Sequence, residues 1–174
     1  KTGRLDCAFY DLLFYMSHDR LDFELGDEKT MADWGCLREG GIGVGKMTYR
    51  TMVFPYMETV DDTTLALVRK LSASGGEIFF VGRFPDRICG ELSDTLADEL
   101  AGLPGVTLCD GFAELARALK NYRPNYLVDC ADASPILCNH RADGDTHYYM
   151  LYNSACAEGR TGRFILNGSC RVTL

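Results

Sequence analysis

The sequence predicts an α/β protein in which a doubly wound, mostly parallel sheet is followed by a small β-rich segment. Between residues 51 and 122, apolar strand-like runs alternate with helical patterns, and glycine or proline separates them. Beyond residue 129 the helical pattern gives way to short strand-like runs. Strands that alternate with helices form βαβ units, whose crossovers are right-handed and whose strands are parallel. Such a sheet carries helices on both faces.

The first fifty residues predict two helices and one strand. Apolar residues fall on one helical stripe over Leu5–Ser17, and Leu21–Leu25 alternates as a short strand does. Asp27 has the right side chain to cap a second helix, which Gly35 would end. Glycines concentrated in residues 36–48 indicate a loop with room for a short edge strand.

The next stretch predicts the first βαβ unit. Thr51–Pro55 is an apolar strand ended by proline, and Glu77–Val81 has the composition of a central parallel strand. Between them we expect Thr59 to cap a helix, with Asp62 as its acidic partner and Gly75–Gly76 as its end. The residues expected on the buried face of this helix are Leu65, Val68 and Leu71.

The alternation of helix and strand then continues as far as residue 122. A helix is predicted over residues 92–101 with its end at Gly102, then a strand at Val106–Leu108 and a helix over Phe112–Tyr122. Later strand-like runs, separated by turn residues, are Ile136–Cys138, His147–Asn153 and Arg163–Leu166.

This change of pattern predicts two domains, an α/β domain at residues 1–132 and a β-rich segment at residues 133–174. The chain begins at Lys1 and ends at Leu174 inside a strand-like run. We therefore expect a piece excised from a longer protein.

Charge and cysteine content narrow the classes of partner. A net charge of −7 and a pI near 4.9 argue against a nucleic-acid or anionic-membrane surface. No apolar run is long enough to span a bilayer. The eight cysteines contain no Cys-x-x-Cys pair, and the three histidines complete no zinc pattern, so neither a metal nor a cofactor is expected. Reduced thiols in a cytoplasmic protein are favoured over a disulfide framework, which stays open.

Several stretches together resemble one family of enzymes. Arg50–Pro55 leads through a helix to Ser74–Pro85, and His18–Leu25 lies before an acidic helix. Downstream, His140–Asp145 runs into the aromatic stretch Tyr148–Asn153. This order is similar to the region that follows the catalytic barrel in large bacterial glycoside hydrolases of the α-L-rhamnosidase and β-galactosidase kind.

The resemblance covers roughly Leu5 to Leu174, although the family's first strand would precede Leu5. It implies a flavodoxin-like domain, similar to class I glutamine amidotransferases and the β-galactosidase trimerisation domain, followed by the start of a β-sandwich. In the family the two catalytic carboxyl groups lie on the barrel, which does not fit in this chain, so no catalytic residue is carried over. The implied role is a non-catalytic accessory region that packs against other domains of the parent polypeptide or against another protomer of a homo-oligomer.

A cysteine-dependent hydrolase or amidotransferase-like enzyme is the alternative. Cys109 stands between a predicted strand and helix, with Gly111 two residues later, as in a nucleophile elbow that exposes the sulfur at a helix N-terminus. Thr107 replaces the usual first glycine, and no histidine is placed beside the sulfur. A buried cysteine that ends a strand, with Asp110 capping the helix, is the simpler interpretation.

A small-ligand or sugar-binding module is the third interpretation. Doubly wound sheets bind ligands beyond the carboxyl ends of their strands, where we expect Gly82, Arg83 and Asp110. Tyrosines 148, 149 and 152 are able to stack on a sugar, while alternation along a strand explains at least two of them as core and cross-strand partners.

Overall fold

The computed structural model describes residues 2–122, 126–131, 136–155, 158–166 and 171. Contacts divide the chain into an α/β unit, Lys1–Leu12 with Glu24–Leu119, and a β unit, Leu13–Phe23 with Lys120–Leu174. Helix α1 (Thr2–His18) therefore contributes to both units. The expected domain boundary at residues 132–133 touches residues outside the described ranges and stays a prediction.

No helix among the described residues is long and apolar enough to cross a membrane.

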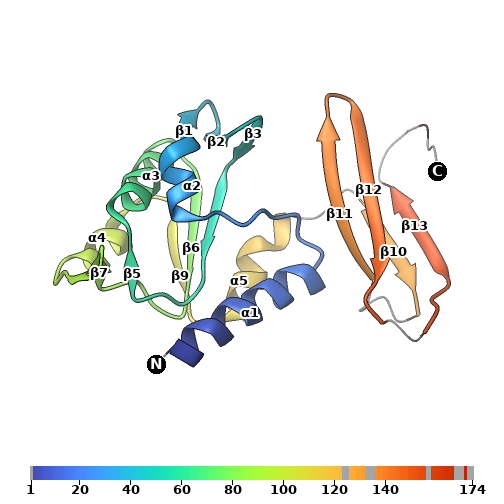
Figure 1. The fold of residues 1–174 in the computed structure, drawn as a ribbon, viewed down its shortest axis with the longest axis horizontal. Coiled ribbons are helices and arrows are strands. Elements are labelled where there is room, and N and C mark those ends of the chain that lie inside the picture. Colours follow the sequence, from blue (N-terminus) through green and yellow to red (C-terminus); the bar gives the residue numbers. More distant parts are fainter. Residues whose placement is uncertain (1, 123–125, 132–135, 156–157, 167–170, 172–174) are drawn as a thin grey trace. The chain divides into compact units, whose positions relative to one another are not determined.

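Three parallel strands form the centre of the α/β unit (Figure 1). They are β4 (Thr51–Phe54), β6 (Glu77–Val81) and β9 (Val106–Cys109), in the order β4-β6-β9. Both pairings are parallel, and β6 lies in the middle as expected from its apolar sequence. The mixed α/β class is therefore confirmed for these strands.

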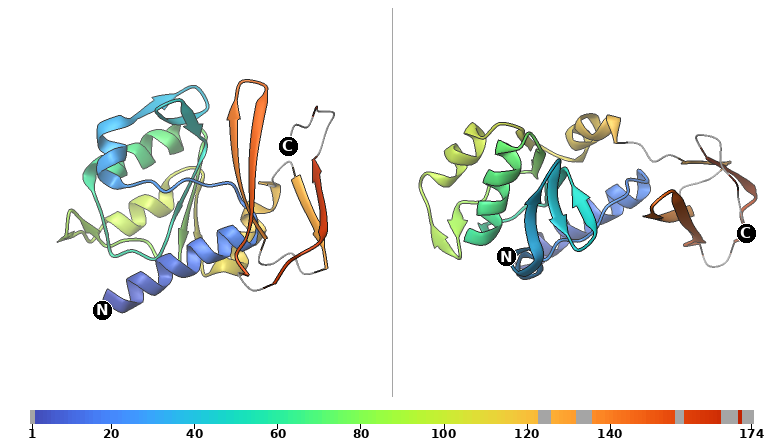
Figure 2. Two further views of the ribbon diagram at one scale, coloured as in Figure 1. Left: turned by 45° about the vertical axis from the view of Figure 1, so that its right-hand side comes forward. Right: turned by 90° about the horizontal axis from the view of Figure 1, so that it is seen from above.

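Helices cover both faces of this sheet. They are α3 (Asp62–Ala73), α4 (Leu96–Gly102) and α5 (Phe112–Ala118), the last followed by a 3-10 turn at Leu119–Asn121. Helix α3 contacts β6, α4 contacts β9, and α5 contacts both strands. Figure 2 shows α3 and α4 on one side of the sheet and α5 on the other.

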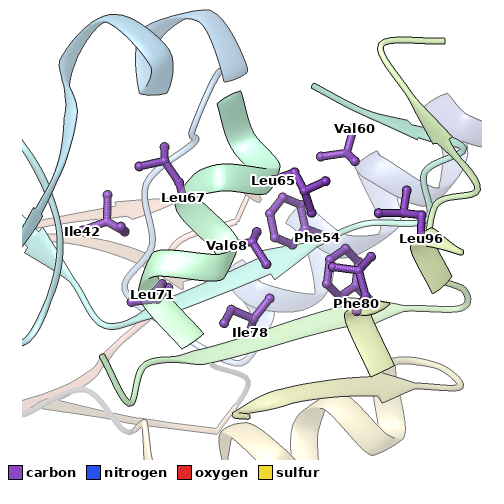
Figure 3. Packing of buried hydrophobic residues seen from close by; sticks show 11 residues of the cluster. Ile42, Phe54, Val60, Leu65, Leu67, Val68, Leu71, Ile78, Phe80 and Leu96 are labelled. Atoms are coloured by element: carbon purple, nitrogen blue, oxygen red, sulfur yellow. The ribbon is translucent and has the colours of Figure 1, made fainter. Parts of the chain in front are cut away.

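The main core lies between the sheet and the helices α3 and α4 (Figure 3). Phe80 stacks on Phe54 with 4.7 Å between ring centroids and meets Phe84 edge-on at 5.2 Å. The three residues expected on the buried face of α3 are all buried in this cluster: Leu65, Val68 and Leu71. Burying apolar area of this kind is the largest favourable contribution to folding.

Residues 36–48, predicted as a loop with a short edge strand, form most of a small three-stranded sheet, so the prediction had too little strand. Its antiparallel strands are β1 (Gly35–Arg38), β2 (Gly41–Val44) and β3 (Met47–Tyr49). A Cβ atom on Gly41 would lie 2.2 Å from the Tyr49 carbonyl oxygen. At Gly41, therefore, the glycine permits a close approach of strands, although glycine in sequence more often marks a loop.

The predicted cap at Thr59 was also wrong. Thr59 and Val60 form the short strand β5, which pairs with β7 (Arg87–Ile88), and β7 pairs with β8 (Glu91–Leu92). The Thr59 hydroxyl accepts a hydrogen bond from the Gly90 amide at 2.9 Å. Helix α3 consequently starts later, with Asp61 as N-cap, and α4 starts only after the hairpin.

The segment before α2 (Glu28–Trp34) gave one wrong and one confirmed prediction. Leu21–Leu25 forms no strand. Its residues alternate as those of a strand do, but its backbone pairs with no strand among the described residues. Asp27 caps α2 as expected, because its carboxylate accepts a hydrogen bond from the Thr30 amide at 2.9 Å, and Gly35 is the C-cap.

The β unit contains two antiparallel pairs. Strand β10 (Tyr126–Cys130) pairs with β13 (Gly162–Leu166), and β11 (Ile136–Asp143) pairs with β12 (Thr146–Asn153). The three strand-like runs predicted beyond residue 129 are confirmed, while β10 was not predicted.

Truncation of the central aromatic side chain should reveal how much the sheet depends on it. Phe80→Ala removes a fully buried ring and is expected to lower the free energy of unfolding by about 3–5 kcal/mol. Leu92→Ala, at a side chain that is 64% exposed, should change it by less than about 0.5 kcal/mol. Chemical denaturation followed by circular dichroism measures both, and equal losses would contradict the proposed role of the core.

The helix caps allow a matched comparison. Asp27→Ala removes a capping side chain and should lower the unfolding midpoint by about 2–4 °C. Asp61→Ala should lower it less, because Asp61 makes no side-chain cap bond. The Thr30 donors lower the Asp27 pKa, so this stabilisation is present above the unfolded pKa and is lost as pH falls through the lower folded pKa. Thermal melts between neutral and acidic pH check this, and a pH-independent difference would disprove it.

Candidate functional site

The carboxyl end of the parallel sheet brings the expected rim residues together. Strand β6 continues into Gly82 and Arg83, and β9 ends at Cys109, directly before Asp110. Val81 pairs with Cys109, and the Gly82 amide donates a hydrogen bond to the Cys109 carbonyl at 2.8 Å. Gly82 has a φ of +86°, a conformation that L side chains rarely adopt.

Arg83 is held by its own loop. Its guanidinium forms an ion pair with Asp86, donates to the Phe84 carbonyl at 3.0 Å, and lies 6.0 Å from the centre of the Tyr56 ring. The ion pair holds the Asp86 pKa below its usual range. Tyr56 follows β4 at the same edge, a position that the strand pattern indicates but that was not predicted as part of the rim.

Asp110 does not cap helix α5, contrary to the expectation. Gly111 is the N-cap and contributes no side-chain bond. The Asp110 amide instead donates to the Glu114 carboxylate at 2.8 Å. Glu114 thus reaches back beyond the N-cap and supplies an acceptor for the amide that precedes the helix.

Cys109 has the properties of a structural residue. It is fully buried at the end of β9. Burial raises the pKa of its thiol, and the Glu114 carboxylate raises it further. A nucleophile elbow requires the opposite, an accessible sulfur with a lowered pKa. The geometry around Cys109 therefore gives no support to thiolate chemistry.

The β unit contains a hydrogen-bonded chain of two histidines and one carboxylate. The register of β11 and β12 places His140 and His147 on one face of the hairpin. Their Nε2 and Nδ1 atoms are 2.8 Å apart, and the rings lie 10° from parallel with centroids 5.0 Å apart. His140 Nδ1 is 3.1 Å from a carboxylate oxygen of Asp22.

The carboxylate determines where the protons lie. Ionised Asp22 only accepts, so His140 donates from Nδ1, and the Nε2 atom of the neutral ring carries a lone pair. With that lone pair on His140 Nε2, the hydrogen bond between the rings is donated by His147 Nδ1. The Tyr149 ring stacks on His140 at 4.6 Å and 9°, which restrains the plane of that imidazole.

Aromatic and sulfur side chains lie beside the two histidines. Tyr149 makes edge contacts with Tyr126 and Phe164 at 5.9 and 5.4 Å between centroids. Burial raises the pKa of Tyr126 and that of the Cys138 thiol, so both groups are neutral at pH 7. Neither the Tyr126 hydroxyl nor the Cys138 thiol is therefore able to act as a general base at pH 7.

The opposite face of the hairpin carries an exposed row, Tyr148, Met150 and Tyr152. Their side chains are 58%, 64% and 50% exposed. Tyr149 alternates to the inner face, where it is a core partner. The set of tyrosines considered for sugar stacking is thus divided between the two faces.

Sequence reasoning missed the histidine pair, although part of its signal was present. Strand-like runs on both sides of Asp143–Gly144 indicate a hairpin, and counting outward from that turn puts His140 and His147 on one face. Asp22 lies 118 residues from His140, and no local pattern connects them.

Neither a metal cluster nor a known relative identifies the site. Within the described ranges, no group of three or more His, Cys, Asp or Glu side chains is placed to hold a metal ion. No protein-family model matches the chain, and neither a curated protein nor a solved structure matches it.

Alkylation rates should separate buried from exposed thiols. In the native protein, iodoacetamide is expected to modify exposed Cys36 and Cys89 at least about tenfold faster than Cys109, whose thiol is buried and has a raised pKa. Peptide mass spectrometry after timed quenching gives the rates. Denaturant should abolish the difference. Preferential modification of Cys109 in the native protein would revive the cysteine-enzyme interpretation.

Proposed function

We propose that this chain is a non-catalytic accessory region of a larger bacterial glycoside hydrolase. It would consist of a flavodoxin-like, doubly wound domain followed by the first strands of a β-sandwich. The order β4-β6-β9 with helices on both faces supports the first part. The two antiparallel pairs of the β unit support the second.

The exposed row on β12 is the main support for an accessory role. Tyr148, Met150 and Tyr152 present apolar surface on a two-stranded hairpin, and Leu127 and Ile165 are exposed opposite each other on the second pair. Two-stranded pairs are marginally stable alone, and contiguous apolar surface usually marks an interface. The partner would be another domain of the parent polypeptide or a second protomer.

The α/β unit supports a role without chemistry of its own. Cys109 is buried, and Arg83 is paired with Asp86 in its own loop. Among the described cysteines, Cys7, Cys36, Cys89, Cys109 and Cys138 are thiols, which fits the cytoplasmic location that we propose.

A sugar-binding module is the second candidate function. The rings of Tyr148 and Tyr152 are exposed on one strand face, and such rings are suited to stack on a saccharide. The same face cannot be covered by a protein domain and be free for sugar, so the two functions make different predictions.

Oxidation of Met150 distinguishes the two functions. Dilute hydrogen peroxide should oxidise Met150 rapidly in the isolated chain, because its side chain is 64% exposed. In the parent polypeptide we expect at least about fivefold protection, since burial blocks access to the sulfur. Met47 of β3, 45% exposed, is the internal control. Peptide mass spectrometry follows both residues.

The oxidation rates of Met150 distinguish the accessory role from the sugar-binding module. Protection of Met150 only in the parent polypeptide supports the accessory role, provided that the gene also encodes a barrel with two catalytic carboxyl groups. Protection in the isolated chain by added saccharides supports the sugar-binding module instead. A gene without a barrel, or equal oxidation in both forms without sugar, overturns the accessory proposal.

A further inference from the structure

We propose that His140 and His147 form a two-nitrogen binding site for a divalent transition-metal ion of the zinc type, with Asp22 as the carboxylate that orients the first ligand. This site is separate from the exposed row on β12 and does not depend on the accessory role. It also goes beyond the sequence pattern, which predicted no metal.

The first argument is the direction of the two nitrogen atoms. His140 Nε2 and His147 Nδ1 are 2.8 Å apart, while the ring centroids are 5.0 Å apart and the rings are within 10° of parallel. Rings whose nearest nitrogens are much closer than their centres meet edge to edge, so the two nitrogens face each other. One hydrogen bond now joins them.

The second argument is the orientation of His140. Asp22 accepts the Nδ1 proton, which leaves Nε2 as the metal-binding atom. Metal-binding histidines commonly donate their other ring proton to a carboxylate in this way. Tyr149, stacked on the ring at 4.6 Å, fixes its plane from the side. The ligand is therefore preorganised before any metal arrives.

The third argument is the size of the movement that binding requires. Zinc–nitrogen bonds of 2.0–2.1 Å in tetrahedral geometry place two ligand nitrogens about 3.4 Å apart, so the rings need to separate by about 0.6 Å, and each needs to turn by about 35° so that its lone pair points at an ion off the line between the nitrogens. His147 is exposed, which gives its ring the freedom to move. Its proton shifts from Nδ1 to Nε2 when Nδ1 binds the ion, so the neutral pair releases no proton overall.

Water would complete the coordination. Two imidazoles leave two positions of a tetrahedral ion to solvent, which agrees with the finding that no described group supplies three ligands. Imidazole favours zinc, copper and nickel over magnesium or calcium. The proposal therefore predicts selectivity for the former ions and moderate affinity.

The test is a zinc titration of the full chain labelled with ¹⁵N-histidine. We expect a saturable shift of the imidazole resonances of His140 and His147 with one zinc ion per chain, and no such shift with magnesium. His147→Gln should weaken the affinity at the remaining His140 resonance at least tenfold. Asp22→Asn should weaken it about tenfold or more, as loss of an orienting carboxylate does.

His18→Gln is the matched control, since His18 is an exposed histidine outside the pair. It should leave the titration curve unchanged. The exposed cysteines do not confuse this measurement, because it reads the imidazoles themselves. An absence of saturable shifts, equal shifts with magnesium, or unchanged affinity at His140 in His147→Gln would each overturn the proposal.

Discussion

The burial of strand β6 is the constraint on which the α/β unit depends. Residues Ile78 to Val81 are all buried, with Ile78 and Phe80 facing the cluster formed with α3 and α4. A strand apolar on both sides can satisfy its backbone only between two other strands, so β4 and β9 pair with it in parallel. The same pairing fixes the edge where Gly82, Arg83 and Asp110 gather. Exposed ion pairs such as that between Arg69 and Glu99 add little by comparison.

The β unit has a different basis, a small aromatic cluster beside the histidine pair. Tyr126, Tyr149 and Phe164 contact one another, and Tyr149 restrains the ring of His140. Aromatic contacts of this kind contribute through burial and ring geometry together. The outer faces of its strand pairs carry exposed apolar side chains.

The polar groups of the two units suit different tasks. At the edge of the parallel sheet, Arg83 is paired with Asp86 of its own loop, and the sulfur that would have to react is buried. In the β unit, two imidazoles and a carboxylate are aligned through shared hydrogen bonds. Alignment of this kind orients a ligand for an ion, whereas local satisfaction mainly holds a loop in place.

The sequence by itself determined the elements whose signal is local. Helical periodicity identified α1 and α3, the apolar run identified β6 as central, and Asp27 and Gly35 marked the ends of α2. Tertiary structure alone decided the pairing of short strands, because the glycines of residues 36–48 fit a loop and a strand equally well, and β5 needed a partner 28 residues away, at Arg87. It also decided the site: Asp22 meets His140 across 118 residues, and a contact between distant segments leaves no trace in either local pattern.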